Sequence, residues 1–266
     1  MQAPCPPLVL IFGPYDPSGA SSLPADAVTC ASLGCHPLST VTAILVQDTA
    51  GVEDIQPVSP ELIDDQARCL LEDMKVQAIK VGPIYTTESA SVLAQIAADY
   101  SHVPLVLHLD RLPDESLAED LHTEDVLLAV CELLLPQTDL VVIDHNLLAQ
   151  WHTEGVFEDS DAESPTDALL EYGAKWVLST GAPLRPGHYS HSLRGQSGET
   201  GDWPWQPPTT RLTDPDSLLS CAITTQLAHG LPMQAAVANA IALCGNAAAR
   251  WLQPGMGHRL IDRTTP

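Results

Sequence analysis

The chain has 266 residues, with 34 acidic side chains against 11 lysines and arginines, and its formal net charge is −23 at pH 7. Such a charge repels the phosphates of nucleic acids and of anionic membranes, so neither partner is expected. The length and the 45% content of hydrophobic residues favour a single domain spanning residues 1–266. The seven cysteines form no Cys-x-x-Cys pair and no export or membrane segment is predicted, so we expect a cytoplasmic protein.

Short apolar runs alternate with amphipathic stretches along the chain. Strands are predicted at residues 8–12, 39–47, 78–82, 104–109, 139–143 and 175–180. Helices are predicted at residues 23–34, 60–74, 86–100, 217–227 and 232–251. The alternation predicts an α/β fold whose mostly parallel central sheet has helices on both faces. The acidic segment 151–165 and the segment 187–208, rich in Gly, Ser, Trp and Pro, are interpreted as surface excursions.

Ligands of open parallel sheets bind beyond the carboxyl ends of the strands. Residues 13–19, 47–49 and 82–85 follow three predicted strands and are therefore the first candidates for a site. The stretch GPYDPSGASSLPAD at 13–26 matches neither a Walker loop nor a dinucleotide-binding fingerprint. Taken alone, it is typical of an ordinary turn between a strand and a helix.

The motifs around this turn resemble those of the hydroxymethylpyrimidine/phosphomethylpyrimidine kinases of thiamine biosynthesis, in the ribokinase-like superfamily. GPYDPSGASSLPAD is similar to that family's G-x-D-P-S-G-G-A-G-x-x-A-D, and QDT at 47–49 to its Q-[ND]-T. KVGPI at 80–84 and VLSTGAP at 177–183 are similar to K-[IL]-G-M and VL-x-x-GGH. The resemblance spans essentially the whole chain. It implies a ribokinase-like three-layer fold, an aminopyrimidine as small-molecule partner, Mg-ATP as co-substrate if the protein is active, and a possible homodimer.

Carried over by position, the resemblance implies a pyrimidine pocket lined by Gly13, Asp26 and Gln47, with Pro83 where the family has a pocket methionine. An amide and a carboxylate offer the donors and acceptors that an aminopyrimidine edge requires. The alternatives are a strand-end role for Gln47 and a helix-dipole role for Asp26. Lys80, at the family's lysine position, is expected in the scaffold.

Thr180 and Gly181 are candidates for the nucleotide side of the site. They follow a predicted strand within the stretch that resembles VL-x-x-GGH. The resemblance therefore implies that they flank a nucleotide.

The family's phosphate-binding loop, G-[ST]-G-C at a helix start, aligns with a four-residue segment that matches it nowhere: Pro215, Asp216, Ser217 and Leu218. Proline has no N–H to donate, and the carboxylates of Asp214 and Asp216 repel a triphosphate. Leu218 stands at the family's cysteine, so no catalytic residue is assigned. The segment makes a well-capped helix start and a poor phosphate cradle.

Other positions that serve phosphate or magnesium in the family also differ. His108 stands at an acidic position, Asp144 at an asparagine and Leu147 at a glutamate. A shift of register that lets Asp110, Asn146 and Cys221 compensate is the less favoured alternative. His108 and His145 are interpreted as strand-end histidines, so no metal site is predicted.

The sequence therefore favours a divergent family member that retains a pyrimidine pocket and has weak or no phosphotransfer, with no cofactor. The alternative is an active ATP-dependent kinase with a compensated anion hole. A sugar or nucleoside kinase is a third, weaker interpretation, because the segment DPDS at 214–217 lacks the glycine-rich context of a catalytic aspartate.

Overall fold

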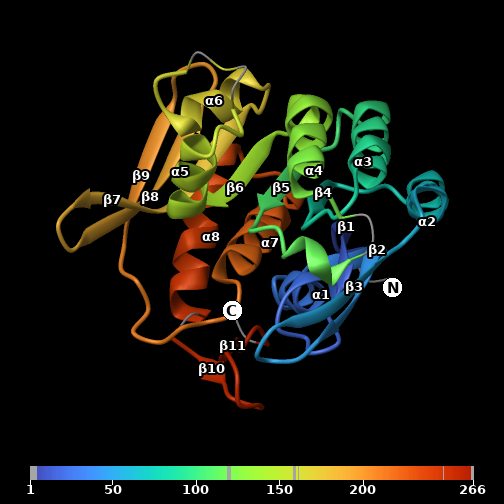
Figure 1. Ribbon diagram of the computed structural model, residues 1–266, viewed down its shortest axis with the longest axis horizontal. Helices are drawn as coiled ribbons and strands as arrows, with labels where there is room; N and C mark the ends of the chain where they lie inside the picture. Colours follow the sequence, from blue (N-terminus) through green and yellow to red (C-terminus); the bar gives the residue numbers. More distant parts are fainter. Residues whose placement is uncertain (1–4, 119–120, 158–159, 161, 248, 265–266) are drawn as a thin grey trace.

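The computed structural model describes residues 5–118, 121–157, 160, 162–247 and 249–264. Within these residues a nine-stranded sheet, in the order β3-β2-β1-β4-β5-β6-β7-β8-β9, forms the centre of the molecule (Figure 1). Its strands are β1 (Leu8–Tyr15), β2 (His36–Gln47), β3 (Val52–Pro57), β4 (Ala78–Val81), β5 (Leu105–Leu109), β6 (Leu140–Asp144), β7 (Trp176–Arg185), β8 (His188–Gly195) and β9 (Thr200–Trp205). The small hairpin beside it is β10 (Trp251–Leu252) and β11 (Leu260–Ile261).

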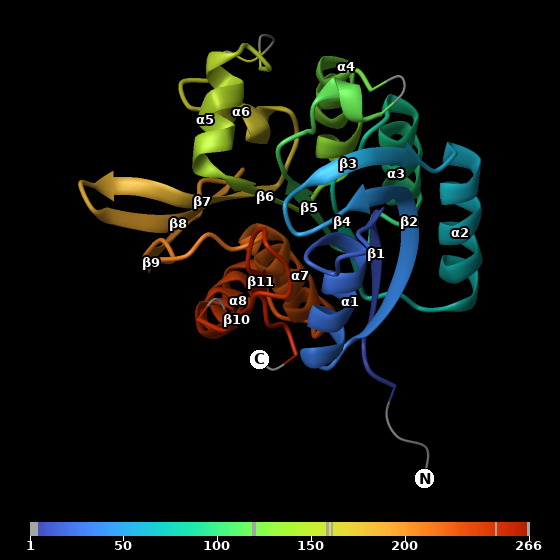
Figure 2. The same cartoon turned by 60° about the horizontal axis from the view of Figure 1, so that its bottom comes forward.

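Helices cover the sheet on two sides. The α-helices are α1 (Ser22–Ser32), α2 (Pro60–Asp73), α3 (Thr87–Asp99), α4 (Thr123–Ala129), α5 (His145–Thr153), α6 (Pro165–Glu171), α7 (Pro215–Ala228) and α8 (Met233–Ala247). Three short turns of other helix types are η1 (Glu115–Leu117), η2 (Val130–Leu134) and η3 (Leu135–Gln137). Figure 2 shows α1, α7 and α8 on one face and α2 to α6 on the other.

The strand pairing is parallel from β2 through β1, β4, β5 and β6 to β7, while β3, β8 and β9 pair antiparallel with their neighbours. Parallel strands joined by crossover helices are buried on both faces, which explains why their sequences read as continuous apolar runs. The predicted α/β fold with a mostly parallel sheet is confirmed.

The core lies on both faces because successive side chains of a strand point in opposite directions. In β4, Ile79 and Val81 pack with apolar residues of α2, α3, α5 and α6. Ala78 packs under α7 and α8, and Lys80 points to the same side, where it contacts α1 and α7. A charged side chain therefore enters the helix-covered face of a central strand, which requires partners for it.

One prediction of a surface segment is wrong, and a second holds for most of the described residues of its segment. Segment 187–208 contains β8 and β9, which extend the sheet as an antiparallel meander. Segment 151–165 includes the end of α5, and Trp151 and Phe157 are both 5% exposed. The second predicted C-terminal helix also ends earlier, at Ala247. In segment 187–208, the Gly, Pro and Ser signals outweighed a short apolar pattern.

The last part of the chain folds back over the carboxyl ends of the strands. The N–H of His258 donates to the carbonyl of Thr49 at 2.6 Å, and Leu212 forms an isolated parallel bridge with Arg259. This return brings residues beyond 250 to the end of β2. Among the described residues, no helix has the length and apolar character that crossing a bilayer demands.

Candidate functional site

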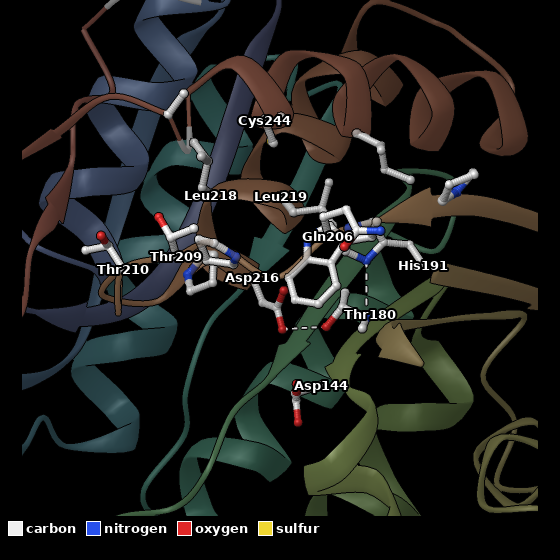
Figure 3. A pocket seen from close by; sticks show the side chains of 18 of the residues that line it. Asp144, Thr180, His191, Gln206, Thr209, Thr210, Asp216, Leu218, Leu219 and Cys244 are labelled. Carbon is white, nitrogen blue, oxygen red and sulfur yellow. Dashed lines mark hydrogen bonds between the residues drawn. The ribbon is translucent and has the colours of Figure 1, made fainter. Parts of the chain in front are cut away.

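Two cavities lie beyond the carboxyl ends of the strands, where the fold predicts ligands. The larger has a volume of about 650 Å³ and is lined by residues of β7, β8, β9, α7 and α8. Figure 3 shows its side chains, with Asp144, Thr180 and Asp216 close together and His191 and Gln206 to one side. The smaller has a volume of about 430 Å³ and lies by the ends of β2, β4 and β5.

The cavities meet at the starts of α5 and α7. Asp144, Pro215 and Asp216 line both of them. We call this shared wall the junction. The amino ends of two helices converge there, an arrangement that ordinarily attracts anions.

At the start of α7, the carboxylate of Asp214 accepts a hydrogen bond from a backbone N–H of the same helix. Asp214 has φ 42° and ψ 65°, a left-handed conformation that aspartate tolerates better than most residues. In this conformation its Oδ1 accepts a hydrogen bond from the N–H of Ser217 at 2.9 Å. Pro215 has no N–H to offer. The chain's own carboxylate therefore holds the position of an anion at this helix end.

Asp216 is part of the junction, and among the described residues it has one hydrogen-bond partner. The hydroxyl of Thr180 donates to its Oδ2 at 2.7 Å (Figure 3). The pKa of Asp216 is raised to about 6, mainly by loss of surrounding water and in part by the carboxylates of Asp214 and Asp144. The hydrogen bond from Thr180 and the nearby His108 act in the opposite direction. The site thus holds a carboxylate that is costly to ionise.

Asp144 caps α5. Its Oδ1 accepts hydrogen bonds from the N–H groups of Asn146 at 2.9 Å and Leu147 at 3.0 Å. Leu147 is buried in the core and Asn146 is exposed, and neither lines the two cavities. The start of α5, like that of α7, is therefore satisfied by an aspartate.

Asp26, which the resemblance placed in a pyrimidine pocket, lines neither cavity. Its carboxylate is 2% exposed and forms ion pairs with Lys80 and, at 3.4 Å, with Arg263. The hydroxyl of Ser217 donates to Asp26 Oδ1 at 2.9 Å, and Lys80 also donates to the hydroxyl and carbonyl of Ser217. Because these partners use its oxygens, Asp26 fixes α1, β4 and α7 to one another.

The other predicted residues divide between the two cavities and the core. Gln47 and Pro83 line the smaller cavity, and Thr180, Gly181 and Leu218 line the larger one. The core holds Gly13, which packs beside Leu23 of α1, as well as Ser217. Cys221 is also buried there, with its thiol directed at the carbonyl of Asp26 at 3.4 Å. Cys221 lines neither cavity, so no cavity contact supports the alternative in which it compensates for the missing family cysteine.

His108 lies on β5, two residues before Asp110, and points to the same side of the sheet as Lys80. The residue is 2% exposed, and its Nε2 lies 3.7 Å from Asp214 Oδ1. Its Nδ1 is buried and has no hydrogen-bond partner among the described residues. His108 lines the smaller cavity, so this nitrogen is a polar group that the protein itself leaves without a partner.

The residues present do not fit a magnesium triphosphate. Among the described residues that line the larger cavity there is no lysine or arginine, and two of the lining side chains are carboxylates. No group of three or more His, Cys, Asp or Glu side chains in the described part of the chain is arranged to hold a metal ion. Attraction for a polyphosphate would have to come from Arg111 and Arg211, which line the smaller cavity and are exposed.

Several site residues could not be found by reading motifs. His191 and Trp205 lie on β8 and β9 and form a wall of the larger cavity, with their ring centroids 5.4 Å apart. Trp203 and Trp205 stand two residues apart, which is the spacing of one strand face. This pattern, although it is no motif, indicates a strand that carries Trp205. Tyr85 and His258 line the smaller cavity and carry no such signal.

Comparison with known proteins agrees with this architecture. A family model described as phosphomethylpyrimidine kinase matches residues 16–262. A hydroxymethylpyrimidine/phosphomethylpyrimidine kinase of Mycobacterium tuberculosis is 32% identical over 247 residues, which cover 87% of this chain and 84% of the relative. Its counterpart from Streptomyces coelicolor is 30% identical over 186 residues, which cover 67% of this chain and 65% of the relative. An ADP complex of Bacillus subtilis pyridoxal kinase superposes with a TM-score of 0.83 at 15% identity, covering 98% of each chain, and confirms the ribokinase-like fold.

Proposed function

The chain belongs to the phosphomethylpyrimidine kinase family, and from this premise we propose that it binds an aminopyrimidine in the smaller cavity and transfers phosphate weakly or not at all. The observation that carries the proposal is the hydrogen bond from the N–H of Ser217 to the carboxylate of Asp214. A donor that a phosphoryl group would need is already used by an anion of the chain.

The electrostatics of the junction support the same conclusion. Phosphoryl transfer depends on donors and cations placed where negative charge develops. Here the junction offers Asp144, Asp216 and a proline without an N–H. Loss of one preorganised donor costs roughly 10² to 10³ in rate, and added carboxylates increase the loss. The expected turnover therefore falls orders of magnitude below that of a working kinase.

The smaller cavity supports the pyrimidine half of the proposal. Gln47 offers an amide that both donates and accepts, and Tyr85 and Pro83 add apolar and aromatic surface beside it. A cavity of about 430 Å³ is of a size that suits a small heterocycle. Asp26 does not line this cavity, so Gln47 and the other lining residues would make the hydrogen bonds to the pyrimidine ring.

An active kinase is the second candidate function. The names of the curated relatives favour it, and so do Arg111 and Arg211 in the wall of the smaller cavity, since they are cations that a phosphate could recruit. This candidate uses Mg-ATP and requires the arginines to supply what the start of α7 lacks.

Calorimetry with 4-amino-5-hydroxymethyl-2-methylpyrimidine tests the binding half. We expect measurable binding in the parent protein and a loss of about tenfold or more in Gln47→Ala, since an amide contact to a ring edge is removed. Gln56→Ala, on the exposed edge strand β3, is the matched control and should bind as the parent does. Absence of binding at millimolar ligand in the parent rules out the pyrimidine pocket.

Pyrimidine-dependent ADP formation tests the catalytic half. The parent and Leu218→Cys should both show weak or no activity, because a cysteine restores no N–H at Pro215 and leaves the carboxylate of Asp216. A graft of Gly-Ser-Gly-Cys at residues 215–218 should raise the rate if the defect lies in this segment. Turnover of about 1 per second in the parent, a typical lower value for an enzyme, would establish the active kinase instead.

A further inference from the structure

The polar side chains at the junction are acceptors. Asp144 and Asp216 line both cavities, and Asp110 and Asp214 line the smaller one. In the described part of the chain, Asp110, Asp144 and Asp216 form no ion pair with lysine or arginine, and Asp214 faces the Nε2 of His108 at 3.7 Å. Contacts to Asp144 and Asp216 come from backbone N–H groups and one hydroxyl, which leave lone pairs on the carboxylates for another donor.

His108 adds an independent acceptor. The Nε2 of His108 faces the carboxylate of Asp214 at 3.7 Å. In a neutral imidazole with its proton on Nε2, Nδ1 carries a lone pair. Nδ1 is buried and has no partner among the described residues, although His108 lines the smaller cavity. A buried nitrogen without a partner costs free energy, which a donor carried by a ligand would recover.

The wall of the larger cavity suits positive charge as well. Trp205 and Trp251 line it, and aromatic faces attract cations. The guanidinium carbon of Arg259 lies 4.0 Å from the centroid of the Trp251 ring, so one face of that ring already carries a cation of the chain. Arg111 and Arg211 of the smaller cavity are exposed, so water screens their charges from the junction.

We propose that the junction binds the positively charged amino group of a small aromatic amine, with the ring in the smaller cavity. For a pyrimidine this means an aminomethyl group in place of the hydroxymethyl group, and that form of the inference rests on the proposed function. The ammonium has three N–H donors, which the carboxylates of Asp144 and Asp216 and the Nδ1 of His108 accept. The neutral alcohol has one donor and no charge, so it uses the same acceptors poorly.

Three probes separate the cation from the ring in calorimetry at pH 7 without added metal. They are 4-amino-5-aminomethyl-2-methylpyrimidine, its 5-hydroxymethyl counterpart, and benzylamine, which has the ammonium without the pyrimidine. We expect the aminomethyl compound to bind about tenfold tighter than the alcohol, in line with a charge-assisted hydrogen bond. Asp216→Asn and Asp144→Asn should each reduce this preference to about twofold or less, while affinity for the alcohol changes little.

Asp65→Asn is the matched control. It removes one carboxylate from the exposed side of α2 and changes the net charge by the same amount, so the preference should persist. Asparagine remains a good helix cap at position 144 and still accepts from Thr180 at position 216, so both test variants are expected to fold.

The outcomes distinguish the inference from the proposed function. Equal affinities for amine and alcohol, or tighter binding of the alcohol, overturn the cation site and leave the pyrimidine pocket standing. Binding of benzylamine that depends on Asp216, without binding of either pyrimidine, supports the cation site and overturns the pyrimidine pocket. Absence of binding by all three probes overturns both.

Discussion

One carboxylate contacts the start of α7 and another belongs to it, and the two have opposite surroundings. Asp26 is 2% exposed and has Lys80, Arg263 and the hydroxyl of Ser217 as partners. Asp216, one residue before Ser217, projects into the junction and has the hydroxyl of Thr180. The first carboxylate is saturated by the protein, whereas the second keeps lone pairs that face open space. Asp26 therefore stabilises the fold, and Asp216 is available to a ligand at some cost in stability.

The largest effect on the free energy of unfolding is expected from removing a partner of the buried Asp26. Lys80→Met removes the closest cation of Asp26 and leaves a buried carboxylate that Arg263 compensates incompletely. The free energy of unfolding should fall by about 3–5 kcal/mol, the usual cost of breaking a buried ion pair. Urea denaturation measures it, with Lys75→Met at an exposed position as the control. A loss below about 1 kcal/mol would mean that Asp26 does not depend on Lys80.

Arg263→Leu should have the next largest effect. The guanidinium contacts Asp26 at 3.4 Å, Thr29 at 3.3 Å and the carbonyl of Asp214 at 3.4 Å. It therefore joins α1 to the start of α7. We call Asp26 and its partners Lys80, Ser217 and Arg263 the Asp26 cluster. We expect a loss of about 2 kcal/mol from these contacts in urea denaturation. Arg194→Leu, which breaks the exposed pair with Asp202, should cost less than about 1 kcal/mol. Equal losses in the two variants would contradict the distinction between buried and surface pairs.

For Asp216, the carboxylate with few partners, Asp216→Asn should stabilise the protein at neutral pH. The pKa of Asp216 is raised from 3.8 to about 6, so its contribution to stability is full below pH 4 and is lost as the pH rises through 6. Because the side chain is only partly buried, we expect a gain of about 1–2 kcal/mol at pH 7. The stabilities of variant and parent should converge near pH 4. A gain that is independent of pH would show that ionisation of Asp216 is not its source.

The smallest effect is expected from Thr180→Val. Among the described residues, Thr180 is the one side-chain donor to Asp216, and its hydrogen bond lowers the pKa of the carboxyl. The variant removes this donor. The pKa of Asp216 should therefore rise, with a loss of stability of about 1 kcal/mol at pH 7. Titration by carbon-detected NMR follows the carboxyl directly. An unchanged pKa would mean that the hydroxyl bond does not hold Asp216 in its ionised form.

The sequence was sufficient for the architecture and for one part of the site. Apolar runs placed β1, β4, β5 and β6 correctly because strands buried on both faces leave a strong pattern. Gln47 was placed in a cavity wall because a motif of fixed spacing ends at the edge of the sheet. A cytoplasmic location, a single domain and a homodimer stay predictions.

The roles of Asp26 and Arg263 were beyond the sequence. A motif gives the position of a carboxylate, but its partners come from β4, α7 and the segment after β11. Nothing local marks Arg263 as buried, since an isolated arginine near exposed polar residues ordinarily reads as surface. The strands β8 and β9 were missed because Gly, Pro and Ser are frequent in them, and antiparallel edge strands tolerate such residues.

The composition of the Asp26 cluster also bears on how the protein is made. The partners of Asp26 lie 54, 191 and 237 residues further along the chain, at Lys80, Ser217 and Arg263. During synthesis the first helix therefore emerges long before the arginine that completes its charge pairing. Contacts of such separation slow folding, because a long loop must close before they form. A nascent chain stalled before residue 263 should hold α1 loosely, and protease sensitivity in that helix should disappear only when the last cation has left the ribosome.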